Sequence, residues 1–292
     1  MTTETRGATQ TSRVRVLPNH GRLLISTDLH GNRGDFERLR SVFFAQREAA
    51  NDPATVHWAL LGDLVHGPSN KARRHAPERY GYADDSPYLI EQLIELRTRW
   101  PDNVHLLLGN HDHGHIGGPH TAKFYDDEVV MLEQRMSAEA IARMRVLFGD
   151  ALLAVAAPCG LLLCHGSPDE QIDSLASLAA IDPRDEPDLA RRSMLRSLLT
   201  SYGQRGEVTA TLLRQISTPE LSLRVVVHGH DIDPDGWYTE SGNQACPVLF
   251  GAAPENRRYL LVDLAARYGR AEDLREEIEV QRLYPVARTS MS

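Results

Sequence analysis

Hydrophobic residues of this chain gather in short runs, and five of these runs each end in a small group of glycine and polar residues. The runs cover residues 23–25, 58–61, 104–108, 161–163 and 225–227. Apolar runs of this length, bounded by glycine and polar residues, are typical of strands buried on both faces. Ligands of such sheets gather beyond the strand ends, where loops meet. We therefore expect five loops to converge on one crevice.

The segments between the runs predict helices and further strands. We expect helices over residues 35–50, 121–136 and 137–148, with Ser137 as the N-cap of the last. Residues 170–217 are expected to be mainly helical, and they either lie over the crevice and shape substrate choice or simply cover a sheet face. Closing strands are expected over residues 237–238, 247–250 and 259–264.

The polar groups after the five runs contain the side chains that bind divalent cations. They are, in chain order, Asp28-Leu29-His30-Gly31-Asn32, Gly62-Asp63, Gly109-Asn110-His111-Asp112, His165-Gly166 and Gly229-His230. Hard and borderline cations prefer carboxylate, imidazole and amide oxygen, and a shared carboxylate lets two ions lie about 3.5 to 4 Å apart. The pattern therefore predicts a dinuclear metal site at the strand ends.

A division of these residues between two ions follows from their spacing. Asp28 and His30 are two residues apart on an extended strand end, so both side chains can point the same way and, with Asp63, hold the first ion. Asp63 could bridge to the second ion. That ion would be held by Asn110, His165 and His230. Manganese is the ion we expect, with iron or zinc as alternatives.

Two ions in such a site would support attack on phosphorus. They lower the pKa of a shared water, so that a bridging hydroxide can attack in line, and they neutralise phosphoryl oxygens in the transition state. His111 follows the candidate ligand Asn110 and is not needed as a ligand itself. We expect it to donate a proton to the leaving alkoxide as a general acid.

The five blocks resemble those of the calcineurin-like metallophosphoesterase superfamily, whose pattern is D-x-H, G-D, G-N-H-[DE], H and G-H. The match runs from Asp28 to about His230. The resemblance implies an α/β fold with two mixed sheets flanked by helices, in which a dinuclear centre hydrolyses phosphate esters. The blocks at residues 28–32, 62–65 and 109–112 are closest to the phosphoprotein phosphatase branch, which includes protein phosphatases and dinucleoside polyphosphatases.

The chain differs from the patterns of the superfamily in two places. The last block is Gly229-His230-Asp231-Ile232 instead of the G-H-x-H of many phosphodiesterases, as expected for the phosphatase branch. The branch usually continues G-D-x-V-D-R-G, whereas residues 62–68 read G-D-L-V-H-G-P. The Asp that would orient the acid histidine and the Arg that would clamp phosphate are therefore both missing.

The polar loop over residues 66–86 is one place from which a phosphate clamp could come. Its cations are Lys71, Arg73, Arg74 and Arg79. Arginine offers a two-pronged fork for phosphoryl oxygens, but a charge cluster alone is more often a solvated surface loop.

Several histidines have alternative interpretations. His228 competes with His230 for one ligand position, and we favour His230 because it directly follows Gly229. His165 could be a core histidine bonded to backbone. Asp28 and His30 could instead cap the following helix. The histidines of the glycine-rich loop that follows His111 could bind a further ion, but we expect them on the surface; they are His113, His115 and His120.

Composition fits a globular enzyme. The 292 residues, 41% hydrophobic and 25% charged, predict one metallophosphoesterase domain over residues 14–284, with a helical insertion at about 170–217 and loose tails at 1–13 and 285–292. The net charge of −8 makes nucleic acid an unlikely partner. Three cysteines without zinc-like spacing indicate reduced thiols in the cytoplasm. No apolar run is long enough to span a membrane.

Three functions are compatible with the sequence. The first is a metallophosphatase that cleaves phosphomonoesters on a small molecule, nucleotide or phosphoprotein, similar to Ser/Thr protein phosphatases. The second is a phosphodiesterase or dinucleoside polyphosphate hydrolase with the same centre. The third, a non-catalytic scaffold, is disfavoured because a binding module has no physical need for six metal ligands and an acid histidine.

Overall fold

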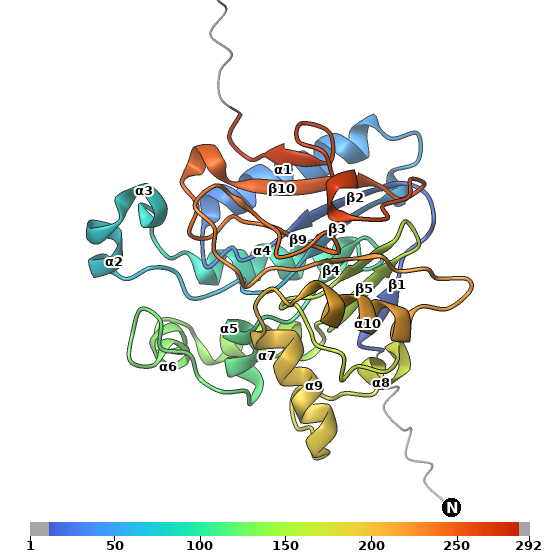
Figure 1. The fold of residues 1–292 in the computed structure, drawn as a ribbon. Helices are drawn as coiled ribbons and strands as arrows, with labels where there is room; N and C mark the ends of the chain where they lie inside the picture. Colours follow the sequence, from blue (N-terminus) through green and yellow to red (C-terminus); the bar gives the residue numbers. More distant parts are fainter. Residues whose placement is uncertain (1–11, 286–292) are drawn as a thin grey trace, which may run out of the picture.

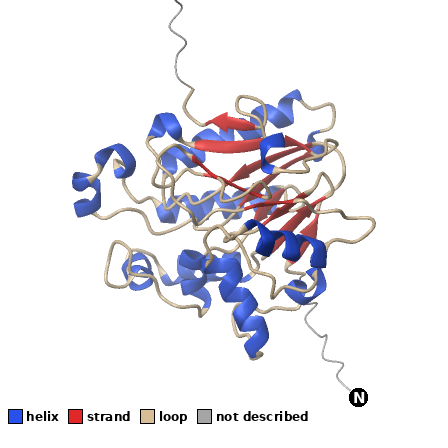
Figure 2. Cartoon of the chain, in the orientation of Figure 1, coloured by secondary structure: helices blue, strands red, loops and turns tan. Residues whose placement is uncertain are grey.

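Two mixed sheets lie face to face in the protein, and helices cover their outer sides (Figures 1 and 2). The structure is a computed structural model that describes residues 12–285. The five-stranded sheet has the order β11 (Val280–Arg282), β10 (Arg258–Asp263), β2 (Arg22–Ser26), β3 (Val56–Leu60) and β4 (Val104–Leu106). The six-stranded sheet has the order β1 (Val14–Val16), β5 (Ala154–Ala157), β6 (Leu161–Leu163), β7 (Val225–Val227), β9 (Gln244–Pro247) and β8 (Trp237–Tyr238). The expected α/β fold with two mixed sheets is confirmed.

The strands that precede the five blocks are parallel within each sheet. β2 pairs in parallel with β3, and β3 with β4, in the five-stranded sheet. β6 pairs in parallel with β7 in the other sheet. The carboxyl ends of parallel strands meet at one sheet edge, so the loops after β2, β3 and β4 are neighbours, as are those after β6 and β7.

The strands are buried on both faces, which explains their uninterrupted apolar sequence. Leu23 and Ile25 of β2 pack between the sheets, in one cluster with residues of β6 and β7. Leu24 points to the opposite face and packs in a second cluster with Phe36 and Phe43 of the first helix. Burying each such side chain contributes about 1.5 to 3 kcal/mol. The two sheets and the outer helices are therefore held by separate apolar layers.

The longer helices lie outside the two sheets. They are α1 (Arg33–Ala49), α4 (Ser86–Arg99), α7 (Ala138–Gly149), α9 (Leu189–Thr200) and α10 (Gly206–Ile216). Short helices fill the connections: α2 (Asn70–His75), α3 (Pro77–Tyr80), α5 (Asn110–His113), α6 (Glu128–Glu133) and α8 (Leu175–Ala179). α1 packs on β2 and β3, and α10 packs on β7. Single 3-10 turns are η1 (Pro53–Thr55), η2 (Gly114–Ile116), η3 (Pro254–Asn256) and η4 (Ala271–Asp273).

Capping residues determine where α1 and α7 begin, within two residues of the starts expected from the sequence. Asn32 caps α1, because its side chain accepts a hydrogen bond from the backbone of Asp35. The N-cap of this helix is thus Asn32, and neither Asp28 nor His30 serves that purpose. Ser137 caps α7 as predicted, accepting from the backbone of Ala140.

Three expected elements were wrong in extent. The predicted helix over residues 121–136 is helical only over α6, because Asp127 is its N-cap and accepts from the backbone of Val130. The loop over residues 66–86 contains α2 and α3, the latter starting with Pro77. Residues 248–250 continue past β9 as a turn instead of a strand.

Residues 1–11 and 286–292, which make up most of the expected tails, lie outside the described residues. Within residues 12–285, no helix combines the length and apolar character needed to cross a bilayer.

Candidate metal centre

The loops that leave the site-bearing strands have an unusual backbone. Of the six non-glycine residues with positive φ in residues 12–285, four are predicted ligands: Asp28 (36°), His30 (43°), Asp63 (50°) and His230 (68°). A fifth, His66, follows the second block. Side chains with a Cβ rarely adopt this left-handed region, and such strain gathers at functional sites because the surrounding fold must hold it. The backbone thus marks these loops independently of the side-chain chemistry.

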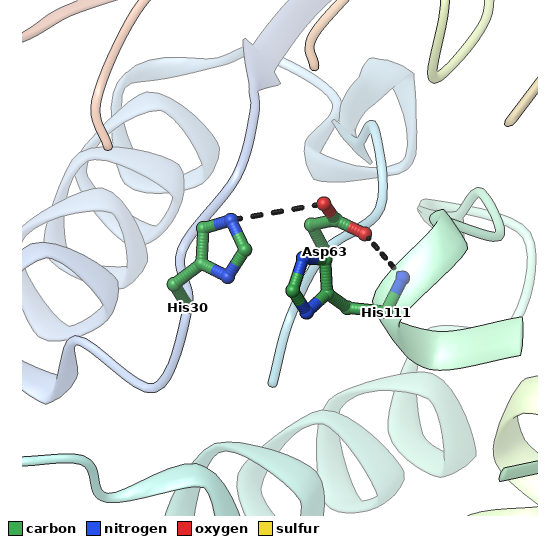
Figure 3. Close-up of side chains that lie close together, drawn as sticks. All are labelled: His30, Asp63 and His111. Atoms are coloured by element: carbon green, nitrogen blue, oxygen red, sulfur yellow. Dashed lines mark hydrogen bonds and ion pairs between the residues drawn. The ribbon is translucent and has the colours of Figure 1, made fainter. Parts of the chain in front are cut away.

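Asp63 lies between two histidines that come from different sheets. Its Oδ2 is 3.7 Å from Nε2 of His30, and its Oδ1 is 3.5 Å from Nε2 of His165. Oδ1 also accepts a hydrogen bond of 2.9 Å from the backbone N–H of His111 (Figure 3). The carboxylate is therefore anchored by one main-chain donor and faces an imidazole on each side.

Both imidazoles present a lone pair to that carboxylate. Nδ1 of His165 lies 2.7 Å from the carbonyl oxygen of Leu61, and Nδ1 of His30 lies 3.1 Å from that of Val65. A carbonyl can only accept, so each Nδ1 carries the proton and each Nε2 carries a lone pair. Lone pairs facing a carboxylate at more than 3.4 Å form no hydrogen bond with it. The donor set fits cations lying between these groups, and backbone bonds of this kind are what orient histidine ligands.

The remaining predicted ligands join the same centre. Oδ1 of Asn110 lies 3.1 Å from Nε2 of His165. A donor atom of His230 lies within 4.8 Å of donors on Asp63 and His165. The Asp28 carboxylate accepts from the backbone N–H of His230, at 3.2 and 3.1 Å for its two oxygens. Asp28 is thus linked to the site through the main chain of His230, whereas His30, Asp63, His165 and His230 belong to groups of converging donor atoms in residues 12–285 that do not include Asp28.

Burial keeps two of the histidines neutral, as ligands must be. Burial and the neighbouring His111 lower the pKa of His30 well below its usual range. Burial also lowers the pKa of His230 to about 4, with His165 adding to the shift. Burial opposes the ionisation of Asp63, yet the nearby His165, His111 and His30 still lower its pKa.

His111 behaves differently from these neighbours. Burial works against its protonation, but the carboxylates of Asp63 and Glu128 outweigh burial and raise the pKa of His111. Among the described histidines with a shifted pKa, His111 is the one that moves upward. Of these histidines it is therefore the one whose surroundings favour the protonated form.

Glycines let the loops of the second and third blocks touch. A Cβ at Gly62, whose φ is 93°, would lie 2.5 Å from the backbone nitrogen of Gly109. A Cβ at Gly109 would lie 2.2 Å from the backbone nitrogen of Asp63. Asp112 fastens the same contact, because its carboxylate accepts from the backbone N–H groups of Leu64 (3.0 Å) and Gly109 (3.1 Å). The position of Asp63 is therefore set by main chain packed on main chain.

The far side of His111 is lined by groups that the sequence did not point to. Its Nδ1 lies 3.0 Å from Nδ1 of His66, 3.2 Å from Oγ1 of Thr121 and 3.3 Å from Oε2 of Glu128. Glu128 belongs to α6 and is 1% exposed. His66 occupies the position at which the phosphatase pattern has an Asp. The motif therefore pointed to this position, but it did not predict that a histidine there would contact His111. Glu128 gave no signal, since residues 121–136 were expected to form one continuous helix.

Nδ1 of His66 is in turn free to accept from His111. Oε1 of Glu133 lies 3.0 Å from Nδ1 of His115, and Nε2 of His115 lies 2.9 Å from Nε2 of His66. Because the Glu133 carboxylate only accepts, Nδ1 of His115 carries a proton, and the neutral His115 leaves its Nε2 as an acceptor for His66. This chain of hydrogen bonds fixes the orientation of His111.

The charges that act on Asp28 and His30 include Lys123 and none of the cations of the expected basic loop. Lys71, Arg73 and Arg74 lie on α2 and Arg79 on α3, which extend from the side of the molecule in Figure 1. Lys123 instead places its Nζ 4.2 Å from the centroid of the Phe250 ring, and that ring is 4.0 Å from the ring of His30. Desolvation lowers the pKa of Lys123, although the charges of Asp63 and Asp28 oppose the shift.

The other histidines considered from the sequence lie outside the groups of metal donors found in residues 12–285. Nδ1 of His228 contacts the carbonyl oxygen of Gly229 at 2.9 Å. Nε2 of His113 lies 2.7 Å from the carbonyl oxygen of Pro183, and Nδ1 of His120 lies 2.8 Å from Asp127. His113 and His115 are buried, although all three histidines of this loop were expected on the surface.

Comparison with known proteins agrees with this geometry. The family model of calcineurin-like phosphoesterases matches residues 21–234. The fold is similar to that of a protein serine/threonine phosphatase from Saccharomyces cerevisiae with similarity to human phosphatase PP5, with a TM-score of 0.61, 17% identity and coverage of 96% of this chain and 86% of that chain. It is also similar to a cold-active protein-tyrosine phosphatase of a psychrophilic Shewanella, with a TM-score of 0.54, 14% identity and coverage of 87% and 78%. Comparison with curated protein sequences gives no match.

Proposed function

The chain belongs to the calcineurin-like phosphoesterase family, and from this premise we propose that it is a metallophosphatase that hydrolyses phosphomonoesters. The observation that carries the proposal is the Asp63 carboxylate between the lone pairs of His30 and His165, at 3.7 and 3.5 Å. This arrangement is unfavourable without cations and favourable with them. The substrate is a phosphorylated small molecule, nucleotide or phosphoprotein.

Six side chains would hold two divalent ions, with manganese expected. The first ion would be held by Asp28, His30 and Asp63, and the second by Asp63, Asn110, His165 and His230. When bound, such ions lower the pKa of water toward neutrality and neutralise phosphoryl oxygens. The protein's contribution is to fix the donors in advance on strained, backbone-bonded loops, so that no rearrangement is needed during the reaction.

His111 is the proposed proton donor to the leaving oxygen. Its pKa is raised, which favours the protonated form, and its backbone N–H bond to Asp63 holds it beside the centre. Glu128 and His66 restrain Nδ1, which leaves Nε2 as the nitrogen free to release its proton. Glu128 would thus take over the orienting role of the Asp that the phosphatase pattern has at position 66.

The compartment and the oxidation state of the thiols belong to the same proposal. Cys159, Cys164 and Cys246 are free and buried, and none is paired in a disulfide. Reduced thiols of this kind support placement in the cytoplasm.

The test combines elemental analysis with kinetics. Purified protein is analysed for bound manganese, iron and zinc, then stripped with a chelator and assayed on p-nitrophenyl phosphate with and without added Mn²⁺. We expect about two ions per chain and hydrolysis that returns only with metal. Protein that binds no metal and turns over no phosphoester would reject the proposal in favour of a scaffold.

A further inference from the structure

A cavity of about 720 Å³ adjoins the proposed centre. One of its lining residues is Asn110 of α5, the proposed ligand of the second ion. The other walls come from residues 117–121, residues 183–186 and one face of α9. This volume is within the range of small-molecule sites, about 300 to 1,000 Å³. A molecule in the cavity would therefore reach the proposed reaction centre.

Two exposed arginines of α9 line this cavity. Arg192 and Arg196 are one helical turn apart and exposed, and neither forms an ion pair within residues 12–285. The neighbouring arginines are occupied: Arg184 pairs with Asp182 at 3.0 Å, and Arg191 with Glu186 at 3.2 Å. Because i and i+4 positions share one helix face, the two free guanidinium groups can act on one anionic ligand.

The acidic groups of the cavity do not cancel these charges. The two lining carboxylates are Asp185 and Glu186. Glu186 is already paired with Arg191 and also accepts from the backbone N–H groups of Asp182 and Asp188. Asp188, which lies outside the lining, is the other carboxylate whose charge acts on Arg192. The lining itself carries three arginines (Arg184, Arg192 and Arg196) against its two carboxylates, so the cavity keeps a net positive charge.

Apolar side chains lie between the arginines on the same helix face. Leu195 and Leu199 alternate with Arg192 and Arg196 along α9, and all four line the cavity. Pro119 and Pro183 add to the apolar surface. A ligand that fits this wall has a flat or apolar body and a charged group beside it.

We propose that this cavity binds a nucleotide that carries at least two phosphate groups. The terminal phosphate would lie at the metal centre beside Asn110, the next phosphate would be bound by Arg192 and Arg196, and the nucleoside at the far end would rest on Leu195 and Leu199. Arginine forks suit phosphoryl oxygens, and a second phosphate gives them a target that a simple monoester lacks. The inference rests on the proposed function, since it places one phosphate of the ligand at that centre.

The test compares ADP with AMP, because the two ligands differ by one phosphate. Isothermal titration calorimetry on manganese-loaded protein measures the affinity of each for the wild type and for the double variant Arg192→Ala/Arg196→Ala. We expect the double variant to weaken ADP binding about 10- to 100-fold and AMP binding less than about threefold. The double variant Arg192→Lys/Arg196→Lys should retain part of the difference between the two ligands.

Arg224→Ala is the matched control, since it removes an exposed arginine that lies outside the cavity lining. It should leave both affinities within about twofold of the wild type. Thermal unfolding of each variant shows whether it is folded. The proposal is overturned if ADP and AMP lose affinity equally, or if ADP binds the folded double variant as it binds the wild type.

Two further outcomes separate this inference from the proposed function. If wild-type protein hydrolyses no phosphoester but its ADP binding depends on the arginine pair, the function fails and the nucleotide site stands. If a doubly phosphorylated peptide depends on the pair while ADP does not, the ligand class proposed here is wrong although the enzyme remains a phosphatase.

Discussion

The metal centre and the α9 wall of the adjoining cavity hold their side chains in opposite ways. In the centre, His30 and His165 are each bonded to a backbone carbonyl through one ring nitrogen, and four predicted ligands lie on left-handed backbone. On the wall, Arg192 and Arg196 are exposed and have no ion-pair partner in the described chain.

This difference separates catalysis from selection. Donors that are fixed before substrate arrives cost no ordering entropy during the reaction, so changes there should act on kcat. Free arginines must be ordered by the ligand, at about 1.5 to 2 kcal/mol of side-chain entropy each, and changes there should act on KM. The following variants test whether changes in the centre lower kcat and changes outside it raise KM.

The largest effect is expected from Asp63→Asn. An amide cannot supply the negative charge that the two proposed ions share, so kcat/KM for p-nitrophenyl phosphate should fall about 1,000-fold or more, with loss of bound metal. Steady-state kinetics and elemental analysis of the same sample measure both effects. A variant that keeps two ions and more than a tenth of the activity would contradict the bridging role.

A smaller loss is expected from His111→Gln. Removing a general acid typically costs about 100- to 10,000-fold, and the loss should be larger for an alkyl phosphate than for p-nitrophenyl phosphate, whose leaving group needs little protonation. Kinetics on both substrates gives the ratio. Equal losses on the two substrates would assign His111 a structural role instead.

Glu128→Ala should have the next effect, because it leaves Nδ1 of His111 without its carboxylate neighbour. Changes behind a functional histidine typically cost about 10- to 100-fold, and the loss should again be larger on the alkyl phosphate. Glu128→Asp should restore part of the activity. Glu95→Ala is the control, since Glu95 is exposed on α4, away from the hydrogen bonds that hold His111.

The smallest effect is expected from Lys123→Met, compared with Lys71→Met on α2. Lys123 lies over Phe250 beside His30, so losing its charge should raise KM about tenfold with kcat nearly unchanged. Lys71 is exposed on α2, and its loss should change KM less than about twofold. A larger rise in KM for Lys71→Met than for Lys123→Met would indicate instead that the loop over residues 66–86 binds the phosphate.

The sequence predicted the parts of the site that directly follow buried strands, because a polar residue or glycine at such a position is readily explained by metal binding or a tight turn. Asp63, His165 and the glycines beside them follow buried strands, and this placement at strand ends predicted that they meet. Sheet edges bring such positions together whatever the intervening loops do. The two sheets and the family followed from the same blocks.

Glu128, Lys123 and the cavity could not be found in this way. Glu128 reaches His111 because Asp127 begins α6 late, which is a matter of a few capping hydrogen bonds and not of periodicity. Lys123 and Arg192 carry charges that look like those of any solvated loop or helix. Their neighbours come from distant parts of the chain, and only tertiary packing shows what they face.

The contact between Gly62 and Gly109 limits where this protein can be mutated when it is engineered toward new substrates. The distance between the imidazoles of His30 and His165 depends on how the backbones of these two turns pack against each other. A side chain at either glycine would clash with the backbone of the other turn. Combinatorial libraries that diversify the surface of α9 should therefore yield altered selectivity from intact catalysts, whereas randomising either glycine should yield inactive clones whatever replaces it.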